Sequence, residues 1–112
     1  MNNPRLATIL DQIADLLDFK GENPFRVNSY RRAARAIREL REDVEALAAR
    51  GELRKVPGIG ETISKTVEEY LASGEVRLHQ ELLTQFPPAL PRLLEIPGLG
   101  PRKVALLHAE LG

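Results

Sequence analysis

The chain has 112 residues, 43% hydrophobic and 29% charged, a length that accommodates one domain or one domain and part of another. It has no cysteine and only two histidines, which excludes disulfides and thiolate metal sites and argues against a histidine metal cluster. The sequence also lacks an apolar run of the ~18 residues that span a membrane and a signal-peptide core, so we expect a cytoplasmic protein.

Hydrophobic periodicity predicts helices along the whole chain and no strands, hence an all-α fold built as a small helical bundle. Asn3 and Pro4 read as an N-cap followed by proline at the first helical position, and they predict a helix to about Asp18. Asn23 and Pro24 predict the start of a second helix in the same way. Its expected inner stripe consists of Val27, Tyr30, Ala34, Ile37 and Leu40.

The formal net charge is zero, but positions 20–41 hold seven basic residues against two acidic ones, a local charge of +5. The basic residues are Lys20, Arg26, Arg31, Arg32, Arg35, Arg38 and Arg41. Arg31, Arg35 and Arg38 recur at helical spacing, so we expect them to project together with solvated charged ends. Like charges at this spacing repel each other, and an anionic partner would relieve that repulsion. The alternative is an ordinary solvated helix face.

Further helices are predicted over about 43–50, 61–73, 78–85, 91–95 and 101–111. Gly51 and Gly74 stand where helices commonly end, and Pro87-Pro88 ends another. The stretch 75–78 follows a terminated helix, so we place a domain boundary there.

Two loops have nearly the same sequence: Val-Pro-Gly-Ile-Gly at 56–60 and Ile-Pro-Gly-Leu-Gly at 96–100. Proline fixes one φ angle and glycine permits the angles of a tight reversal, so each loop could be a plain turn. Each loop also precedes a predicted helix, whose first N–H groups lack intrahelical partners and lie at the positive end of the helix dipole. A phosphate can bind such a terminus where no side chain intervenes. The pair resembles helix-hairpin-helix motifs, which bind the DNA backbone without reading sequence.

The segments 23–34 (Asn-Pro-Phe-Arg-Val-Asn-Ser-Tyr-Arg-Arg-Ala-Ala), 56–60 and 70–74 (Tyr-Leu-Ala-Ser-Gly) follow one another in a characteristic order. In this order and spacing the chain resembles the N-terminal region of family X DNA polymerases, most of all the bacterial ones. The resemblance implies that residues 1–76 form a domain that grips the 5′-phosphate downstream of a DNA gap. Residues 77–112 would begin the next subdomain, which holds the upstream duplex.

The same resemblance implies a role in DNA repair, by gap filling in base excision repair near the bacterial nucleoid. We expect the partner to be gapped or nicked duplex DNA and the protein to be a monomer that does not bind membranes. The polymerase carboxylates of the family lie beyond residue 112, so we expect this chain to be part of a longer protein. Mg²⁺ would then be needed only by the full-length polymerase.

The resemblance places the phosphate pocket at Arg26, Tyr30 and the backbone of Gly58 and Gly60, with Arg31 beside them. Arginine can give a phosphate two parallel hydrogen bonds, and a tyrosine hydroxyl can give a third. Without that role, Tyr30 would be an aromatic residue of the inner stripe and Arg26 a solvated residue. Further DNA contacts are expected from Arg35, Ile59, Lys65, Gly98, Leu99, Gly100, Arg102 and Lys103.

The family also binds a monovalent cation, K⁺ or Na⁺, in each hairpin through main-chain carbonyls and a DNA phosphate oxygen. By position, the resemblance implies the carbonyls of Arg54, Val56 and Ile59 in the first hairpin and of Leu94, Ile96 and Leu99 in the second. Without DNA, the hairpins would hold water instead.

Some family members remove a 5′-deoxyribose phosphate with a Schiff-base lysine, and the matching position here is Thr66. Lys65 is turned ~100° around the helix from that position. Glu68 and Glu69 lie close to Lys65 in sequence and favour its charged form, which is not nucleophilic. The resemblance therefore supports phosphate binding and leaves enzymatic activity open.

Three other interpretations stay open at this stage. The first is a 5′-deoxyribose phosphate lyase that uses Lys65, Lys55 or the terminal amine of Met1. The second is a bundle that only docks proteins, against which the basic stripe argues. The third is a free-standing two-hairpin protein of excision or recombination, which the separation of forty residues between the hairpins fits less well.

Overall fold

The computed structural model describes residues 2–87, 89–98, 100, 101 and 103–105, and within them the chain is helical with no strand. The elements are α1 (Asn3–Phe19), α2 (Pro24–Glu39), α3 (Val44–Ala49), the short 3₁₀ helix η1 (Leu53–Lys55), α4 (Glu61–Ser73), α5 (Arg77–Gln85) and α6 (Leu90–Leu94). Residues 101 and 103–105 are also helical, and the rest of the predicted last helix lies outside the described residues. The all-α prediction is confirmed.

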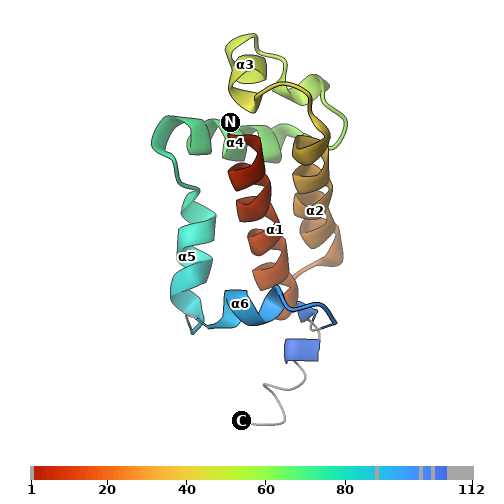
Figure 1. Cartoon of the computed structure of the whole chain (residues 1–112), viewed down its shortest axis with the longest axis vertical. Helices are drawn as coiled ribbons and strands as arrows, with labels where there is room; N and C mark the ends of the chain where they lie inside the picture. The colour runs from red at the N-terminus through yellow and green to blue at the C-terminus, as the bar shows by residue number, and fades with distance from the viewer. Residues whose placement is uncertain (1, 88, 99, 102, 106–112) are drawn as a thin grey trace.

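The first helix, α1, is the centre of the molecule (Figure 1). α2 runs antiparallel to α1 on one side, α5 packs along the other side, and α6 crosses the lower end of α1 in this view. α1 can serve three neighbours because its apolar positions cover much of its circumference. Its buried residues include Leu6, Leu10, Ile13, Leu16 and Leu17, each at most 1% exposed. No helix in the described part of the chain is long and apolar enough to cross a membrane.

The start of α1 is fixed by a contact distant in sequence, and here the prediction for Asn3 was wrong. The N-cap position is Asn2, and its side chain caps nothing. The Asn3 side chain is buried, accepts a hydrogen bond from the Val44 N–H at 2.9 Å, and donates to the Glu42 carbonyl at 2.9 Å. Asn3 therefore ties α1 to the link between α2 and α3. The prediction for Asn23 is confirmed, since its side chain accepts from the Phe25 N–H.

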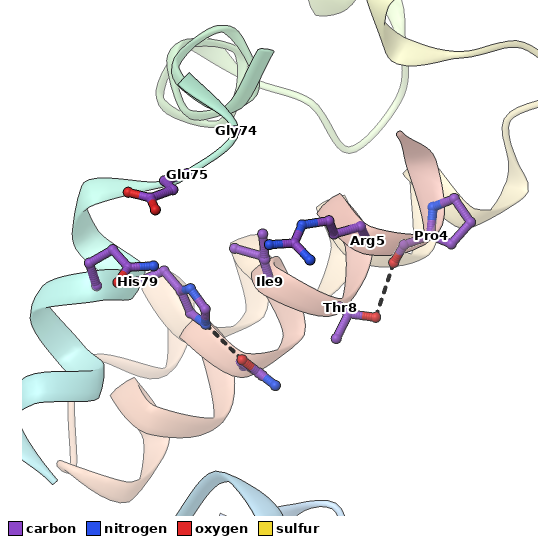
Figure 2. Close-up of a pocket in the computed structure, with 9 residues that line it drawn as sticks. Pro4, Arg5, Thr8, Ile9, Gly74, Glu75 and His79 are labelled. Atoms are coloured by element: carbon purple, nitrogen blue, oxygen red, sulfur yellow. Dashed lines mark hydrogen bonds between the residues drawn. The ribbon is translucent and has the colours of Figure 1, made fainter. Parts of the chain in front are cut away.

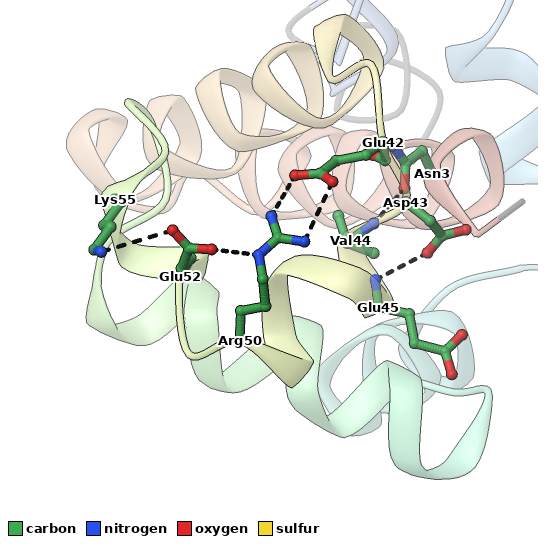
Figure 3. A network of polar contacts seen from close by, with 8 residues as sticks. All are labelled: Asn3, Glu42, Asp43, Val44, Glu45, Arg50, Glu52 and Lys55. Carbon is green, nitrogen blue, oxygen red and sulfur yellow. Dashed lines mark hydrogen bonds and ion pairs between the residues drawn. The ribbon is translucent and has the colours of Figure 1, made fainter.

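Polar contacts also hold the link that leads from α2 to the first hairpin (Figure 3). Asp43 caps α3: burial alone would raise its pKa, but hydrogen bonds from the Asn2 and Glu45 backbone outweigh burial and lower the pKa below its ordinary value. Arg50, at the end of α3, pairs with both Glu42 and Glu52. Glu52 immediately precedes η1, so these pairs brace the segment on which the hairpin is carried.

The first hairpin, residues 56–60, rests directly on α2 at Gly58. This glycine has a φ of +97°, and a Cβ there would lie 3.2 Å from the Cβ of Ala36 and 3.3 Å from the main-chain oxygen of Arg32. The next residue, Ile59, is 3% exposed and anchors the loop in the core. Gly60 differs, because its φ is −91° and a Cβ there would meet nothing within 4 Å. Of the two hairpin glycines, Gly58 is therefore the one whose position requires glycine.

The second half of the chain is joined to α1 by a polar bridge at Gln12. The buried His79 of α5 points toward α1 (Figure 2), with its Nε2 2.6 Å from Oε1 of Gln12, so we assign the ring proton to Nε2 as donor. The Gln12 amide nitrogen in turn donates to Glu95, beyond α6, at 3.4 Å. A hollow of about 410 Å³ lies beside this bridge, lined by residues of α1, the α4–α5 turn and α5. Burial, and then the nearby Arg5, lowers the pKa of His79.

We expect Gly58→Ala to destabilise the protein by about 1–2 kcal/mol for the backbone angle alone, with a further loss from crowding against α2. Gly60→Ala is the matched control and should change stability by less than about 0.5 kcal/mol, since its angle suits any residue. Urea unfolding followed by circular dichroism measures both. Equal losses in the two variants would contradict the placement of the hairpin on α2.

The lowered pKa of His79 makes stability depend on pH in a defined direction. Below the unfolded value of about 6.5, the unfolded chain takes up the proton before the folded chain does, so stability falls until the folded pKa is reached. We expect His79→Gln to remove most of this loss between about pH 7 and the folded pKa. Thermal unfolding across that range tests the expectation, and an unchanged pH dependence in the variant would refute it. Asp15 does not mimic the effect, because burial raises its pKa and its contribution has the opposite sign.

Candidate nucleic-acid interface

A hollow of about 560 Å³ lies where the first hairpin meets α2 and α4. It is lined by Ser29 and Arg32 of α2, by Arg54 before the loop, by the loop residues Val56, Pro57, Gly58, Ile59 and Gly60, and by Glu61, Thr62 and Ile63 of α4. This is the hairpin that the sequence predicted as a phosphate site. The structure brings Gly58, Ile59 and Gly60 together with two arginine side chains at one open surface.

The N-terminus of α4 opens into this hollow without a capping side chain. Gly60 is the N-cap residue, and it has no side chain to occupy the N–H groups of the first turn. These groups lack intrahelical partners and lie at the positive end of the helix dipole. Glu61, in the same turn, directs its carboxylate to Lys65 at 3.7 Å. The geometry therefore offers main-chain donors that an anion can approach.

The two arginines of the hollow carry the positive charge of the site. Arg32 and Arg54 are exposed, and no carboxylate in the described part of the chain pairs with either one. Sequence reasoning missed both side chains: Arg32 was one member of the basic run, and Arg54 was named only for its carbonyl. The small residues Ser29 and Ala36 could have indicated Arg32, because they flank it at helical spacing and leave room for the loop to lie against α2.

Arg26 and Tyr30 do not line the hollow. Arg26, in the first turn of α2, is exposed and lies 3.9 Å from Glu22. Tyr30 is 3% exposed and belongs to the inner stripe of α2. The sequence had allowed this position as the alternative to a phosphate ligand. No fully buried side-chain oxygen among the described residues lacks a partner, and the Tyr30 hydroxyl has no hydrogen bond, so that hydroxyl reaches the surface.

Two members of the basic stripe are held in ion pairs, although Arg38 is exposed as expected. Arg31 donates to Asp15 at 2.8 Å and lies 3.6 Å from Asp18, while Arg38 pairs with Asp11. The three carboxylates come from α1, so the chain itself supplies the anionic partner that the spacing seemed to require. Arg35 is exposed, and the structure shows no ion pair for it within the described residues.

The helix after the first hairpin shows no nucleophilic lysine pocket. Lys65 is exposed, with 74% of its side chain accessible, and it forms an ion pair with Glu61. Thr66, at the position of the family lysine, donates its hydroxyl to the Thr62 carbonyl on the same helix. The sequence suggested Glu68 and Glu69 as the carboxylates near Lys65. In the structure the carboxylate that pairs with Lys65 is Glu61.

The second hairpin lies at the opposite end of the α1–α2 pair from the first (Figure 1). Gly98 has a φ of +83° and is exposed, and Gly100 and Lys103 are exposed as well. The Val104 N–H donates to the Gly100 carbonyl at 3.1 Å, which begins a helix directly after the loop. Leu99 and Arg102, both predicted to contact DNA, lie outside the described residues.

At the first hairpin, the main-chain oxygens expected to bind a monovalent cation belong to three residues around one hollow. Arg54, Val56 and Ile59 all line the hollow. The Val56 oxygen accepts the Ile59 N–H at 3.0 Å, whereas no backbone N–H of the described residues bonds to the oxygens of Arg54 or Ile59. Carbonyl oxygens suit a hard monovalent cation, so these residues fit one. At the second hairpin, Leu94 precedes the loop and Ile96 is its first residue, and Leu99 lies outside the described residues.

The comparisons with known proteins agree with this geometry. A helix-hairpin-helix domain family matches residues 1–76. The chain is also 34% identical over 112 residues to the DNA polymerase/3′-5′ exonuclease PolX of Bacillus subtilis (strain 168). That alignment covers 100% of this chain and 19% of the relative, so the chain spans about a fifth of the relative's length. The predicted resemblance to a bacterial family X DNA polymerase is confirmed.

Proposed function

Because this chain belongs to the helix-hairpin-helix domain family, we propose that it binds the DNA backbone without reading sequence and holds the 5′-phosphate of a gap at its first hairpin. The observation that carries the proposal is the hollow in which the uncapped N-terminus of α4 meets Arg32 and Arg54. Main-chain N–H groups and guanidinium groups are the donors that phosphate oxygens accept most readily.

Each part of the hollow has a distinct task in this proposal. The N–H groups of the first turn of α4 bind phosphate oxygens, and the absence of a side chain at Gly60 lets the phosphate approach. Arg32 and Arg54 supply charge at the two walls. The family resemblance also assigns Arg26 and the Tyr30 hydroxyl to the terminal phosphate, although neither residue lines this hollow. None of these groups contacts a base, so binding is independent of sequence.

A monovalent cation would be held by the main-chain oxygens of Arg54, Val56 and Ile59. When bound, K⁺ or Na⁺ would supply positive charge between these oxygens and a DNA phosphate oxygen. The second hairpin would bind the duplex on the other side of the gap through Gly98, Gly100 and Lys103, and on sequence grounds through Leu99 and Arg102.

We infer that the chain is the gap-recognising part of a repair polymerase related to PolX, since its whole length aligns with that relative. Polymerisation would depend on parts of such a protein that this chain does not contain. We do not assign a lyase activity, because the exposed Lys65 is paired with Glu61 and Thr66 stands at the nucleophile position.

The first test concerns Gly60. We expect the wild-type chain to bind gapped DNA with a downstream 5′-phosphate more tightly than the same gap with a 5′-hydroxyl, by fluorescence anisotropy. Gly60→Val fills the entrance with a side chain and should reduce this preference by about tenfold, the equivalent of about 1.4 kcal/mol, while the fold is kept.

Gly100→Val is the control for that test, since Gly100 also has open space around it but lies in the second hairpin. It should keep the 5′-phosphate preference and weaken binding to the duplex side. An absent preference in the wild type would overturn the phosphate site, and equal effects of the two valines would overturn the division of labour between the hairpins.

A second test concerns the charge of Arg32. Each phosphate neutralised by a protein cation contributes about 0.9 to the slope of log affinity against log salt, so Arg32→Gln should flatten that slope by about 0.9. Arg5→Gln on α1, beside the hollow at His79, removes the same charge and should leave the slope unchanged. Titrations at several salt concentrations measure both, and matching slopes for the two variants would exclude Arg32 from the interface.

A further inference from the structure

The second helix, α2, carries arginines on two different flanks. Arg31 and Arg38 are separated by seven residues and therefore lie nearly in line along the helix, facing α1. Arg32 is turned ~100° from Arg31 and faces the first hairpin. By sequence alone, the flank of Arg31 and Arg38 carries more positive charge than the flank of Arg32. A DNA backbone attracted to α2 would therefore have two surfaces to choose from.

The carboxylates of α1 remove that ambiguity. Asp11, Asp15 and Asp18 recur at the same helical spacing as the arginines opposite, and the antiparallel helices bring them into register. The hollow between them, about 380 Å³, is lined by three carboxylates (Asp11, Asp15 and Glu95) and two guanidinium groups (Arg31 and Arg38). The hollow at the hairpin has the reverse balance, with Arg32 and Arg54 against Glu61.

Stability alone does not account for the pairing at Asp15. Burial raises the pKa of this carboxyl, and the hydrogen bond and charge of Arg31 do not fully compensate for it. A half-buried ion pair of this kind adds little net stability, because desolvation of the two charges offsets much of their attraction. The pair is better explained by what it does to the charge of the surface than by what it adds to the fold.

We propose that Asp11, Asp15 and Asp18 make α2 one-sided for DNA, neutralising the flank of Arg31 and Arg38 so that the phosphate backbone binds only at the flank of Arg32. The inference rests on the proposed function and deepens it, because it assigns residues that direct DNA to the hairpin. A phosphate that approached Arg31 would have to displace Asp15 and Asp18, and it would meet an excess of negative charge. Such repulsion gives specificity without adding any contact to the correct partner.

The experiment releases Arg31 by the double change Asp15→Asn and Asp18→Asn, which preserves side-chain shape. We expect affinity for an intact duplex with 5′-hydroxyl ends to rise about fivefold, with a salt slope steeper by about 0.9, because one more cation reaches the backbone. The preference for a gapped 5′-phosphate should fall correspondingly, since a competing surface has been opened. Adding Arg31→Gln to this variant should cancel the gain.

The matched control is Glu75→Gln with Glu81→Gln, which removes the same charge and frees Arg77 from its ion pair with Glu81. Glu75 precedes α5, and Arg77 and Glu81 belong to it. α5 lies on the side of α1 away from α2 (Figure 1). We expect the affinity of this variant for the intact duplex to rise by less than half as much as that of the aspartate variant. It should also retain the 5′-phosphate preference. An equal gain in the control would show an effect of net charge only and would overturn the proposal.

A second variant covers the case in which the double change prevents folding. Asp11→Asn releases Arg38 at a more exposed pair, in which 35% of the Asp11 side chain is accessible, and should produce the same changes on its own. Suppose that the wild type prefers 5′-phosphate and that the folded variants have the same salt slope as the wild type. This result would refute the one-sided helix and leave the proposed function intact. A wild type with no 5′-phosphate preference would instead refute the proposed function.

Discussion

The approach of Gly58 to α2 is the constraint on which the candidate site depends. Main chain packs against main chain here, with the position of a Gly58 Cβ only 3.3 Å from the Arg32 oxygen, which no other residue would permit without displacement. Because the loop rests on α2, the N-terminus of α4 opens beside Arg32. Burial of Ile59 holds the loop from beneath. The core, the turn and the anion site are therefore one continuous structure, although their residues lie on three segments of the chain.

Much of this architecture could be predicted from local patterns. The bounds of α4, at 61–73, follow from Gly60 before it and Gly74 after it, and Gly74 has the left-handed φ of +79° expected of a helix end. The cap at Asn23 is equally local, since its side chain bonds to a residue two positions away. In both cases the deciding interaction lies within a few residues, where sequence periodicity and residue preferences contain the information.

The predictions that were wrong concern side chains whose partners are distant in sequence. Asn3 is a residue type that often caps helices, but its side-chain oxygen instead accepts a hydrogen bond from the Val44 N–H, 41 residues away. The ion pairs of Arg31 and Arg38 were not predicted, because the carboxylates that pair with them lie on another helix. The aspartates of α1 recur at the same spacing, but only the antiparallel packing of the two helices shows that they meet. Charge counts in a segment say little about which charges remain available to a ligand.

The bridge at Gln12 has a consequence for the order in which the molecule assembles. α1 and α2 are consecutive helices joined by a short link, so their contact requires little loop-closure entropy and can form early. Gln12 must instead wait for His79, 67 residues away, and for Glu95, 83 residues away. The half of the chain that bears the second hairpin should therefore dock late in folding and detach first in unfolding, as a separate cooperative unit. The first hairpin belongs to the early unit, so we expect its geometry to persist after the second half has detached.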